Sequence, residues 1–560
     1  MATPVHPALQ PCHPVVRDWF HETLGEPTEP QIRGWPVIRE GKDVLIAAPT
    51  GSGKTLTAFL ACLDELYRSA AAGTLTDETH VLYVSPLKAL GNDVQKNLLL
   101  PLEQLMERAK VLGLALPDIR VMVRSGDTPA HERASMVKKP PHILITTPES
   151  LYLYLTANKS RETLRSVKTV VVDEIHALAR DKRGSHFALS LERLKALTGR
   201  SPQFIGLSAT TRPLDRLAHF LVGEPREGRA PCEVVQVGHV RPWELWLEVP
   251  EDELSAAPTH EMWGQLYDRI AALSAEHRTM LVFSNTRRLA ERVAHDLGER
   301  LGHDKVAAHH GSMARELRLK AEDRLKSGTL KVMVATASLE LGLDVGSIDL
   351  VVQLGSPRSI AVMLQRLGRS GHHKAAISKG VLFAMTRDEL VESTALLAAI
   401  SRGHLDAVRM PEKPLDVLAQ QVVAEVAARE WNEEELFQVL RRAMPYEALT
   451  REEYEKVLHL ASEGISTTRG RSRVHLHRDR VNGVLRPRAG ARLMALQNGG
   501  AIPDLFSYAV KAEPEDKTVG TLDEDFAIES MPGDVFVLGS TSWRIRRVFG
   551  GEVRVENAHG

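Results

Sequence analysis

The stretch APTGSGKT, residues 48–55, directly follows the apolar run DVLIA and precedes a segment of helical period. Gly51 and Gly53 let the backbone approach a ligand closely, and successive N–H groups at a helix N-terminus attract phosphate. In this pattern Lys54 reaches the β- and γ-phosphates of a nucleotide, and the Thr55 hydroxyl ligates Mg²⁺. The order of strand, glycine-rich loop and helix therefore predicts a Walker A loop, with alanine in place of glycine at its first position.

An alternation of strand and helix surrounds this loop. From residue 43 to residue 210, short β-rich apolar runs alternate with longer segments of helical period, which is typical of βαβ units around a parallel sheet. After the Pro- and Gly-rich stretch 222–231, the rhythm resumes and ends near residue 386. The sequence therefore predicts two α/β domains in tandem.

The last part of the chain has a different pattern. Residues 412–464 lack strand runs and have helical period, and VNGV at 481–484 is a hairpin signal, so we expect a winged-helix module. Beyond residue 513 an acidic stretch leads into alternating strands. Because two or three strands rarely stand alone, we expect them to begin a longer β-barrel-like domain, with pairing to the winged-helix module as the alternative. The expected domain limits are 1–225, 226–405, 406–505 and 506–560.

Composition excludes several classes of protein. The 560 residues are 43% apolar and 26% charged, which is typical of a soluble globular protein, and the net charge of −1 means that any nucleic-acid contact must come from local patches. Cys12, Cys62 and Cys232 are too far apart for a disulfide framework, a zinc finger or an iron–sulfur cluster. We find no signal-peptide pattern and no stretch of 18 apolar residues, so we expect a cytoplasmic location, at the nucleoid in a bacterium, and no membrane role.

The stretch VVVDEIH, residues 170–176, ends an apolar strand in two acids. Both carboxylates are expected at the carboxyl edge of the sheet, beside the phosphate loop. There Asp173 would hold Mg²⁺ through water, and Glu174 would orient and deprotonate the attacking water. Such a pair is commonly just solvated surface, but the Walker loop upstream favours the catalytic interpretation. His176 can also simply satisfy a backbone carbonyl.

The stretch QRLGRSGH, residues 365–372, supplies two arginines from the second α/β domain. If it begins a helix, Arg366 and Arg369 lie on one face at i, i+3, and Gly368 permits close approach. A guanidinium from a neighbouring surface stabilises the γ-phosphate charge during hydrolysis, and Arg369 is the stronger candidate, with Gln365 beside it. The alternative is that these arginines form surface salt bridges, as most arginines do.

Together these motifs resemble the superfamily 2 DEAD/DEAH-type helicases, and more narrowly the large helicase-related (Lhr) family. The resemblance covers essentially the whole chain and rests also on TEPQIRGWPVI at 28, SPLKAL at 85, TTPES at 146, SAT at 208, LVFSNTRR at 281, HHGSM at 309, ATASLELGLDVG at 335 and GGAIPD at 499. It implies two tandem RecA-like (P-loop) domains, a winged helix and the start of a β-barrel-like domain. Family members usually run much longer, so we expect this chain to be part of a longer protein.

The resemblance also implies roles for individual residues. Nucleotide binding falls to Gln31, which reads the adenine, and to Thr50, Gly51, Ser52, Gly53, Lys54, Thr55, Gly342 and Asp344. Coupling of hydrolysis to domain movement falls to His176, Ser208, Ala209 and Thr210. Contacts to the backbone of the tracking strand fall to Ser85, Lys88, Thr147, Ser284, Asn285 and Thr336. Each of these short motifs alone is typical of an ordinary strand end. Many superfamily 2 members have a second arginine where this chain, like the Lhr group, has His372.

The region 465–492 offers a nucleic-acid surface beyond the motor. It holds eight arginines and one acid, Asp479, on and around the expected hairpin. Such a patch neutralises phosphates without reading bases, and a solvated arginine-rich face is the alternative. The expected DNA contacts are Arg471, Arg473, Arg478 and Arg480. Trp543 in the strand SWRIRR can stack on a base, although a lone tryptophan is more often part of a core.

The resemblance therefore implies an ATP- and Mg²⁺-dependent DNA translocase and helicase that moves 3′ to 5′ and serves DNA repair. Its partners would be single-stranded DNA, DNA or RNA–DNA duplexes, and DNA-repair proteins. Two alternatives stay open at this point. One is an RNA-directed motor, because backbone contacts do not distinguish the sugars unless a 2′-hydroxyl is read. The other is a nucleotide-gated clamp without turnover.

Overall fold

The computed structural model describes most of the chain. The described residues are 4–49, 51–86, 98–114, 118–126, 128–224, 230–238, 242–255, 258–310, 313, 315–339, 348–371, 377–467, 470–472, 474–501, 507–514, 516–523, 526–527, 530, 532–538, 541–549 and 551–558. Within these ranges, no helix has the length and apolar character needed to cross a bilayer.

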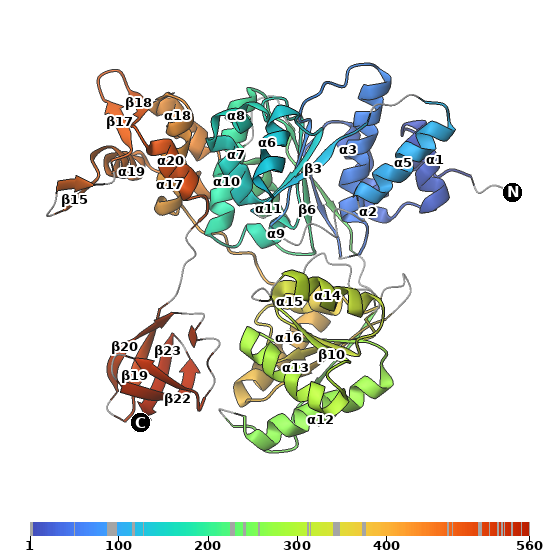
Figure 1. The fold of residues 1–560 in the computed structure, drawn as a ribbon, viewed down its shortest axis with the longest axis vertical. Coiled ribbons are helices and arrows are strands. Elements are labelled where there is room, and N and C mark those ends of the chain that lie inside the picture. The colour runs from blue at the N-terminus through green and yellow to red at the C-terminus, as the bar shows by residue number, and fades with distance from the viewer. Residues whose placement is uncertain are drawn as a thin grey trace. The chain divides into compact units, whose positions relative to one another are not determined.

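The chain folds into two compact units (Figure 1). The first combines Met1–His239 with Ala407–Pro503, and the second combines Val240–Asp406 with Asp504–Gly560. Each unit is therefore built from two separate stretches of sequence.

The first unit contains a seven-stranded sheet in the order β3-β4-β2-β5-β6-β1-β7, in which all the paired strands are parallel. Its strands are β1 (Val44–Ala47), β2 (Val81–Val84), β3 (Val121–Arg124), β4 (Ile143–Thr146), β5 (Thr169–Val172), β6 (Gln203–Ser208) and β7 (Glu233–Gln236). Strands β1, β2 and β4 are buried along their whole length, as parallel strands covered on both faces must be. This confirms the α/β expectation for the first part of the chain.

Helices cover both faces of this sheet (Figure 1). They are α1 (Pro14–Thr23), α2 (Glu29–Arg39), α3 (Lys54–Ala71), α5 (Leu100–Val111), α6 (Ala130–Lys138), α7 (Pro148–Thr156), α8 (Asn158–Glu162), α9 (Ile175–Leu178), α10 (Lys182–Thr198) and α11 (Leu214–Val222). Successive side chains of a strand point to opposite faces. Accordingly, Val44 and Ile46 belong to a core with residues of α1 to α3, whereas Leu45 belongs to a core with residues of α10.

A winged-helix module completes the first unit, as expected. It consists of α17 (Leu415–Ala428), β14 (Trp431–Asn432), α18 (Glu433–Arg441), α19 (Arg451–Glu463), β15 (Ile465–Thr467), β16 (Gly470–Ser472), β17 (Leu476–Asp479), β18 (Val484–Pro487) and α20 (Ala491–Gln497). The VNGV signal marks a real hairpin, because Asp479 pairs with Val484 in antiparallel strands. The apolar residues of this module continue the core that lies on the α10 side of the sheet.

A buried ion-pair cluster joins the winged helix to the first sheet domain. The carboxylate of Glu425 on α17 accepts hydrogen bonds from Arg161 Nη2 at 2.7 Å and from Arg193 Nε at 2.7 Å. Trp431 Nε1 also donates to Glu425, at 3.2 Å. Burial alone would raise the pKa of Glu425, but the two arginines outweigh it and hold the pKa below its usual range. The ionised carboxylate is thus the electrostatic link between the two parts of this unit.

The second unit contains a six-stranded parallel sheet in the order β10-β11-β9-β12-β13-β8. Its strands are β8 (Trp243–Glu248), β9 (Met280–Phe283), β10 (Val306–His309), β11 (Val332–Ala335), β12 (Leu350–Leu354) and β13 (Ser378–Phe383). Its helices are α12 (His260–Glu276), α13 (Arg287–Leu301), α14 (Arg315–Lys326), α15 (Ile360–Leu367) and α16 (Arg387–Ser401). The second α/β prediction is confirmed.

The C-terminal strands form a sheet of their own. β19 (Ser507–Ala512), β20 (Lys517–Asp523), β21 (Val535–Leu538), β22 (Thr541–Phe549) and β23 (Glu552–Asn557) pair in the order β20-β19-β23-β22-β21 around a small core that includes Ile545. Among the described residues these strands pair with one another and not with the winged helix, so the alternative of pairing to that module is wrong. Five strands bury enough side chains on a shared face to make that partner unnecessary.

Replacing Glu425 by alanine is expected to lower the free energy of unfolding of the first unit by about 3–5 kcal/mol, because two buried guanidinium groups lose their counter-charge. Denaturant unfolding followed by circular dichroism measures this. The control is Glu430→Ala, which removes a carboxylate that is 60% exposed and paired with Arg486. Equal losses in the two variants would contradict the assigned importance of the buried cluster.

Candidate nucleotide site

The carboxyl edge of the first sheet collects most of the predicted motor residues of the first unit. Because the strands are parallel, the segments that follow β1, β2, β4, β5 and β6 all emerge at one edge. Backbone hydrogen bonds continue beyond the strands and fix neighbouring segments: the Ala48 N–H donates to the Ser208 carbonyl at 3.1 Å, and the Asp173 N–H donates to the Val84 carbonyl at 2.8 Å. The Walker loop, the acidic pair and the SAT segment are therefore adjacent.

The phosphate loop has the conformation that its glycines predict. Gly51 has φ +75° and Gly53 has φ +88°, both in the left-handed region. A Cβ at Gly53 would also lie 3.2 Å from Gln31 Nε2, so this position is crowded as well as strained. The Lys54 ammonium is folded over the loop, where it donates to the carbonyl oxygens of Ala48 at 2.7 Å and Pro49 at 2.9 Å. A glycine-rich turn that leads into a helix N-terminus, with a lysine ammonium beside it, is a combination of groups that attracts phosphate. Thr50 lies outside the described residues.

Gln31 is buried beside this loop. Its side-chain oxygen accepts a hydrogen bond from the Thr28 N–H at 2.7 Å, which closes a capping box at the start of α2. Besides the ligand role that the family resemblance implies, Gln31 thus has a structural role, for which the spacing Thr28-x-x-Gln31 is a capping signal in the sequence. The cap fixes the side chain against Gly53, so any contact with a base starts from a positioned amide.

Asp173 is 7% exposed and held by two donors. The Tyr83 hydroxyl donates to one carboxylate oxygen, and the Glu174 N–H donates to the other at 2.8 Å. Burial and then the neighbouring Glu174 carboxylate raise the pKa of Asp173 above its usual range. A divalent cation would relieve this unfavourable burial of charge, and oxygen ligands such as the Asp173 carboxylate and the Thr55 hydroxyl are the type that Mg²⁺ prefers. Tyr83 was missed because an aromatic residue inside an apolar strand carries no functional signal.

Glu174 adopts a left-handed backbone conformation with φ +47° directly before α9. Such a conformation costs free energy in a residue with a Cβ, and it is found most often where a side chain must be aimed. The carboxylate is 14% exposed, and its Oε2 lies 3.5 Å from His176 Nδ1. Glu174 is thus the less buried of the two acids and the one that solvent can reach.

His176 links the acidic pair to the SAT segment. Its Nδ1 accepts a hydrogen bond from the Ala209 N–H at 3.2 Å, which requires a neutral ring. Burial, followed by the positive charges of Arg180 and Lys54, lowers the pKa of His176 to about 3. Ser208 ends β6, and its hydroxyl donates to the Ala209 carbonyl at 2.8 Å, which stiffens the same turn. Thr210 follows in that turn and is partly exposed.

The second unit carries the arginine motif at the end of a helix. QRLGRSGH was expected to begin a helix, but α15 starts at Ile360, where the Ser359 side chain caps it, and it ends at Leu367. Gly368 follows as the C-cap, so Arg369 lies beyond the helix and not on its face. The expectation that this stretch begins a helix, with Arg366 and Arg369 on one helical face, is therefore wrong. The helix begins at the Ser359 cap instead, so the arginine motif falls at its C-terminal end.

Arg366 and Arg369 have different surroundings. Arg366 is 4% exposed, donates to Gln353 Oε1, and lies 4.8 Å from the centroid of the Phe283 ring. These contacts fasten Arg366 into the core of its own domain. Arg369 is also buried, at 7% exposure, and Gln365 has the same exposure. Gly342, Asp344 and His372 lie outside the described residues.

The side chains expected to contact a nucleic-acid backbone lie at strand ends in both units. Thr147 caps α7 by accepting the Ser150 N–H at 3.3 Å, and Ser85 is buried after β2. In the second unit, the Ser284 hydroxyl donates to the Thr286 carbonyl at 3.0 Å, and Asn285 donates to the Ser356 carbonyl at 2.9 Å. Thr336 follows β11 and is partly exposed. Lys88 lies outside the described residues.

The arginine patch of the winged helix is not uniform. Arg478 is paired within the module, with its Nε donating to Glu433 at 2.7 Å and its Nη2 to Glu455 at 2.7 Å. Hydrogen bonding to Glu455 is the main reason that the pKa of Arg478 is raised. This pairing speaks against the expected DNA contact of Arg478. Arg480 is 64% exposed, whereas the side chain of Arg471 and all of Arg473 lie outside what the structure describes.

Trp543 lies on β22, directly opposite Phe536 of β21. Its ring packs against the small core of the C-terminal sheet and is partly exposed. It is therefore a core residue with one accessible side, which leaves base stacking as a prediction.

Comparison with known proteins agrees with this arrangement. Family models match in three segments: DEAD/DEAH box helicase over residues 28–217, Helicase conserved C-terminal domain over 263–374, and Large helicase-related protein, winged helix domain over 398–560. Two RecA-like folds with these motifs define the superfamily 2 helicase class. The chain belongs to the large helicase-related (Lhr) family within that class.

Similar proteins cover nearly the whole chain. An ATP-dependent helicase Lhr-Core protein 2 of Thermococcus barophilus is 42% identical over 97% of this chain and 64% of its own length. An Lhr helicase/probable uracil glycosylase of Mycolicibacterium smegmatis is 42% identical over 98% of this chain and 38% of its own length. A solved structure of the Mycobacterium smegmatis helicase Lhr bound to ssDNA and AMP-PNP has 43% identity and a TM-score of 0.80, and covers 89% of this chain and 63% of that chain. The chain thus spans less than two thirds of these relatives.

Because the buried His176 ring is neutral, the free energy of unfolding is expected to depend on pH. Its folded pKa of about 3 lies below the unfolded value of about 6.5, so the unfolded state binds the extra proton first as the pH falls. The contribution of the neutral His176 to the free energy of unfolding is therefore fully present well above pH 6.5 and declines as the pH falls below that value. Between pH 7.5 and pH 5 the wild type is expected to lose about 2 kcal/mol more than His176→Gln, whose amide oxygen can still accept the Ala209 N–H. Denaturant unfolding at both pH values measures this, and equal losses would contradict the assignment.

Proposed function

We propose that this chain is the motor of an ATP-dependent DNA translocase and helicase that tracks along single-stranded DNA from 3′ to 5′, unwinds duplexes and serves DNA repair. The observation that carries the proposal is the carboxyl edge of the first sheet, where Lys54 and its phosphate loop lie beside the buried Asp173 and the more accessible Glu174. The similarity to the Lhr structure bound to ssDNA and AMP-PNP supports the proposal that this chain binds both a nucleotide and single-stranded DNA.

In this proposal ATP is the substrate of the phosphate loop. The backbone N–H groups of Gly51, Ser52 and Gly53 bind its phosphates, and Lys54 leaves the loop carbonyls to pair with them. Thr55 and Asp173 would hold Mg²⁺, which would neutralise charge at the phosphates. Glu174 orients the attacking water and accepts its proton. Gln31 binds the adenine.

The arginine motif of the second unit completes the reaction. Arg369 stabilises the charge that develops on the γ-phosphate, while Arg366, with its contacts to Gln353 and Phe283, positions the segment that carries Arg369. His176 couples the acidic pair to the segment Ser208, Ala209 and Thr210, because its ring accepts a hydrogen bond from the Ala209 N–H. The family resemblance adds Gly342 and Asp344 to the proposed nucleotide contacts.

Single-stranded DNA is the proposed track. Its backbone contacts fall to Ser85, Lys88, Thr147, Ser284, Asn285 and Thr336, with Arg471, Arg473 and Arg480 adding sequence-independent affinity and Trp543 stacking on a base. Separating a duplex costs about 1.4 kcal/mol per base-pair step, which lies within the range that a nucleotide-driven motor can supply.

Arg369→Ala is expected to reduce DNA-stimulated ATP turnover by about 10³-fold or more while leaving nucleotide binding intact, because the guanidinium acts on the transition state. Glu174→Gln should show the same separation, whereas Lys54→Ala should lose nucleotide binding as well. Steady-state phosphate release and binding of a fluorescent ATP analogue measure the two quantities. The control is Arg278→Ala, which removes an arginine that is 87% exposed. Turnover by Arg369→Ala at the wild-type rate would remove its proposed role.

Strand displacement tests the choice of DNA. Tailed substrates with DNA or RNA as the tracking strand and as the displaced strand are compared in all combinations, with the tail at either end. We expect ATP turnover and displacement with a single-stranded DNA tail on the 3′ side, whatever the displaced strand. Activity on an RNA track alone would replace the proposal by an RNA-directed motor, and ATP-dependent binding without displacement would replace it by a clamp.

A further inference from the structure

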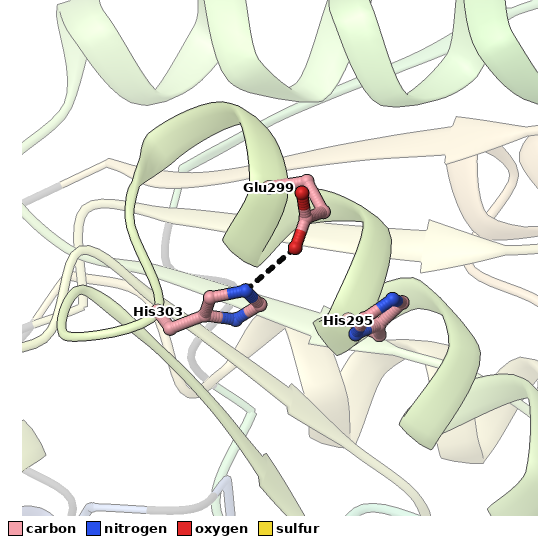
Figure 2. A group of neighbouring side chains, drawn as sticks. All are labelled: His295, Glu299 and His303. Carbon is pink, nitrogen blue, oxygen red and sulfur yellow. Dashed lines mark hydrogen bonds and ion pairs between the residues drawn. The ribbon is translucent and has the colours of Figure 1, made fainter.

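Three ligand-bearing side chains meet at the end of α13, in a place that the proposed motor chemistry does not use (Figure 2). His295 and Glu299 lie one helical turn apart on α13, and His303 follows the helix after Gly302. One ligand atom from each of the three residues lies within 4.8 Å of the other two. His303 Nε2 is 2.7 Å from Glu299 Oε1, and the His295 and His303 rings stack with centroids 5.7 Å apart.

Two glycines let the chain form this group. A Cβ at Gly298 would lie 2.3 Å from His303 Nδ1, so the imidazole of His303 occupies the space that only a glycine leaves. Glycine in a helix interior costs about 1 kcal/mol relative to alanine, so Gly298 is unfavourable for α13 itself. Gly302 has φ +99° and turns the chain back over the helix end. Gly298 therefore lowers the stability of α13 but leaves room for His303 to lie against Glu299 and His295.

The donor set selects a class of metal. Two imidazole nitrogens and one carboxylate oxygen are typical ligands of Zn²⁺ and neighbouring first-row transition metals, whereas Mg²⁺ and Ca²⁺ prefer oxygen alone. A tetrahedral zinc ion with bonds of about 2.0 Å needs donors about 3.3 Å apart. All three side chains are exposed, so small rotations about their side-chain bonds can bring the donors to that spacing.

We propose that His295, Glu299 and His303 form a binding site for a first-row transition-metal ion. Zn²⁺ is the proposed ion, and water completes its coordination. An exposed histidine–glutamate pair is the simpler interpretation of the contact between His303 and Glu299. It does not account for the ring of His295, which stacks on His303 and brings a third ligand atom to the pair.

A bound ion would join the end of α13 to the turn that leads into β10. β10 is the edge strand of the second sheet, and it pairs on one side with β11. Since His303 lies in the connection between α13 and β10, the ion would tie that connection to the last turns of α13. The site is separate in its chemistry from the Mg²⁺ proposed for the phosphate loop.

Zinc titration of the full chain against a chromogenic chelator tests the proposal. Because the chain has 23 histidines, the site is measured by difference between variants. His295→Ala and His303→Ala should each weaken the tightest zinc equivalent by at least about tenfold, and zinc should raise the midpoint of thermal unfolding in the wild type but in neither variant. Cobalt bound to the wild type should give a tetrahedral visible spectrum that both variants lose.

Gly298→Ala separates a metal site from an ordinary helix end. The added methyl group displaces His303, so zinc affinity should fall even though alanine favours the helix. The matched control is Gly264→Ala in α12, where a Cβ meets nothing within 4 Å and zinc binding should be unchanged. Equal zinc binding by the wild type, His295→Ala and His303→Ala, or wild-type affinity in Gly298→Ala, would overturn the proposal.

Discussion

The parallel pairing of the first sheet is the constraint on which the candidate site depends. Parallel strands release their following segments at one edge, and here that edge receives the phosphate loop after β1, the acids after β5 and the SAT turn after β6. The buried side chains of Lys54 and Asp173 lie there beside the more accessible Glu174. The Tyr83 hydroxyl and the Glu174 N–H satisfy Asp173, and loop carbonyls satisfy Lys54. These contacts hold the groups in place before any ligand binds.

In the same unit, the first sheet domain and the winged helix form one compact body. They share one continuous hydrophobic core, and inside it Glu425 is paired with Arg161 and Arg193. A buried carboxylate between two arginines tolerates little displacement, because any loss of contact leaves a charge unpaired in a poorly solvated place. The Glu425 cluster therefore fixes the orientation of α17 against α8 and α10.

The sequence predicted the sheets, the hairpin and the phosphate loop because each has a local signal. Apolar runs of strand length mark the sheets, VNGV marks the turn, and glycine spacing marks the loop. It could not predict partners that lie far away in the chain. In the sequence, Arg478 is one of several arginines of a basic patch. Only the fold shows that its guanidinium donates hydrogen bonds to Glu433 and Glu455. Likewise, the start of α15 depends on the Ser359 cap, which lies outside the arginine motif.

The most direct measurement of the central claim is an experimental structure of this chain with a non-hydrolysable ATP analogue and Mg²⁺. We expect phosphates on the N–H groups of residues 51–53, the Lys54 ammonium moved from the loop carbonyls to the phosphates, and Mg²⁺ between the Thr55 hydroxyl and the Asp173 carboxylate. Nucleotide bound elsewhere, or Lys54 still on the carbonyls of Ala48 and Pro49 with the nucleotide in place, would contradict it.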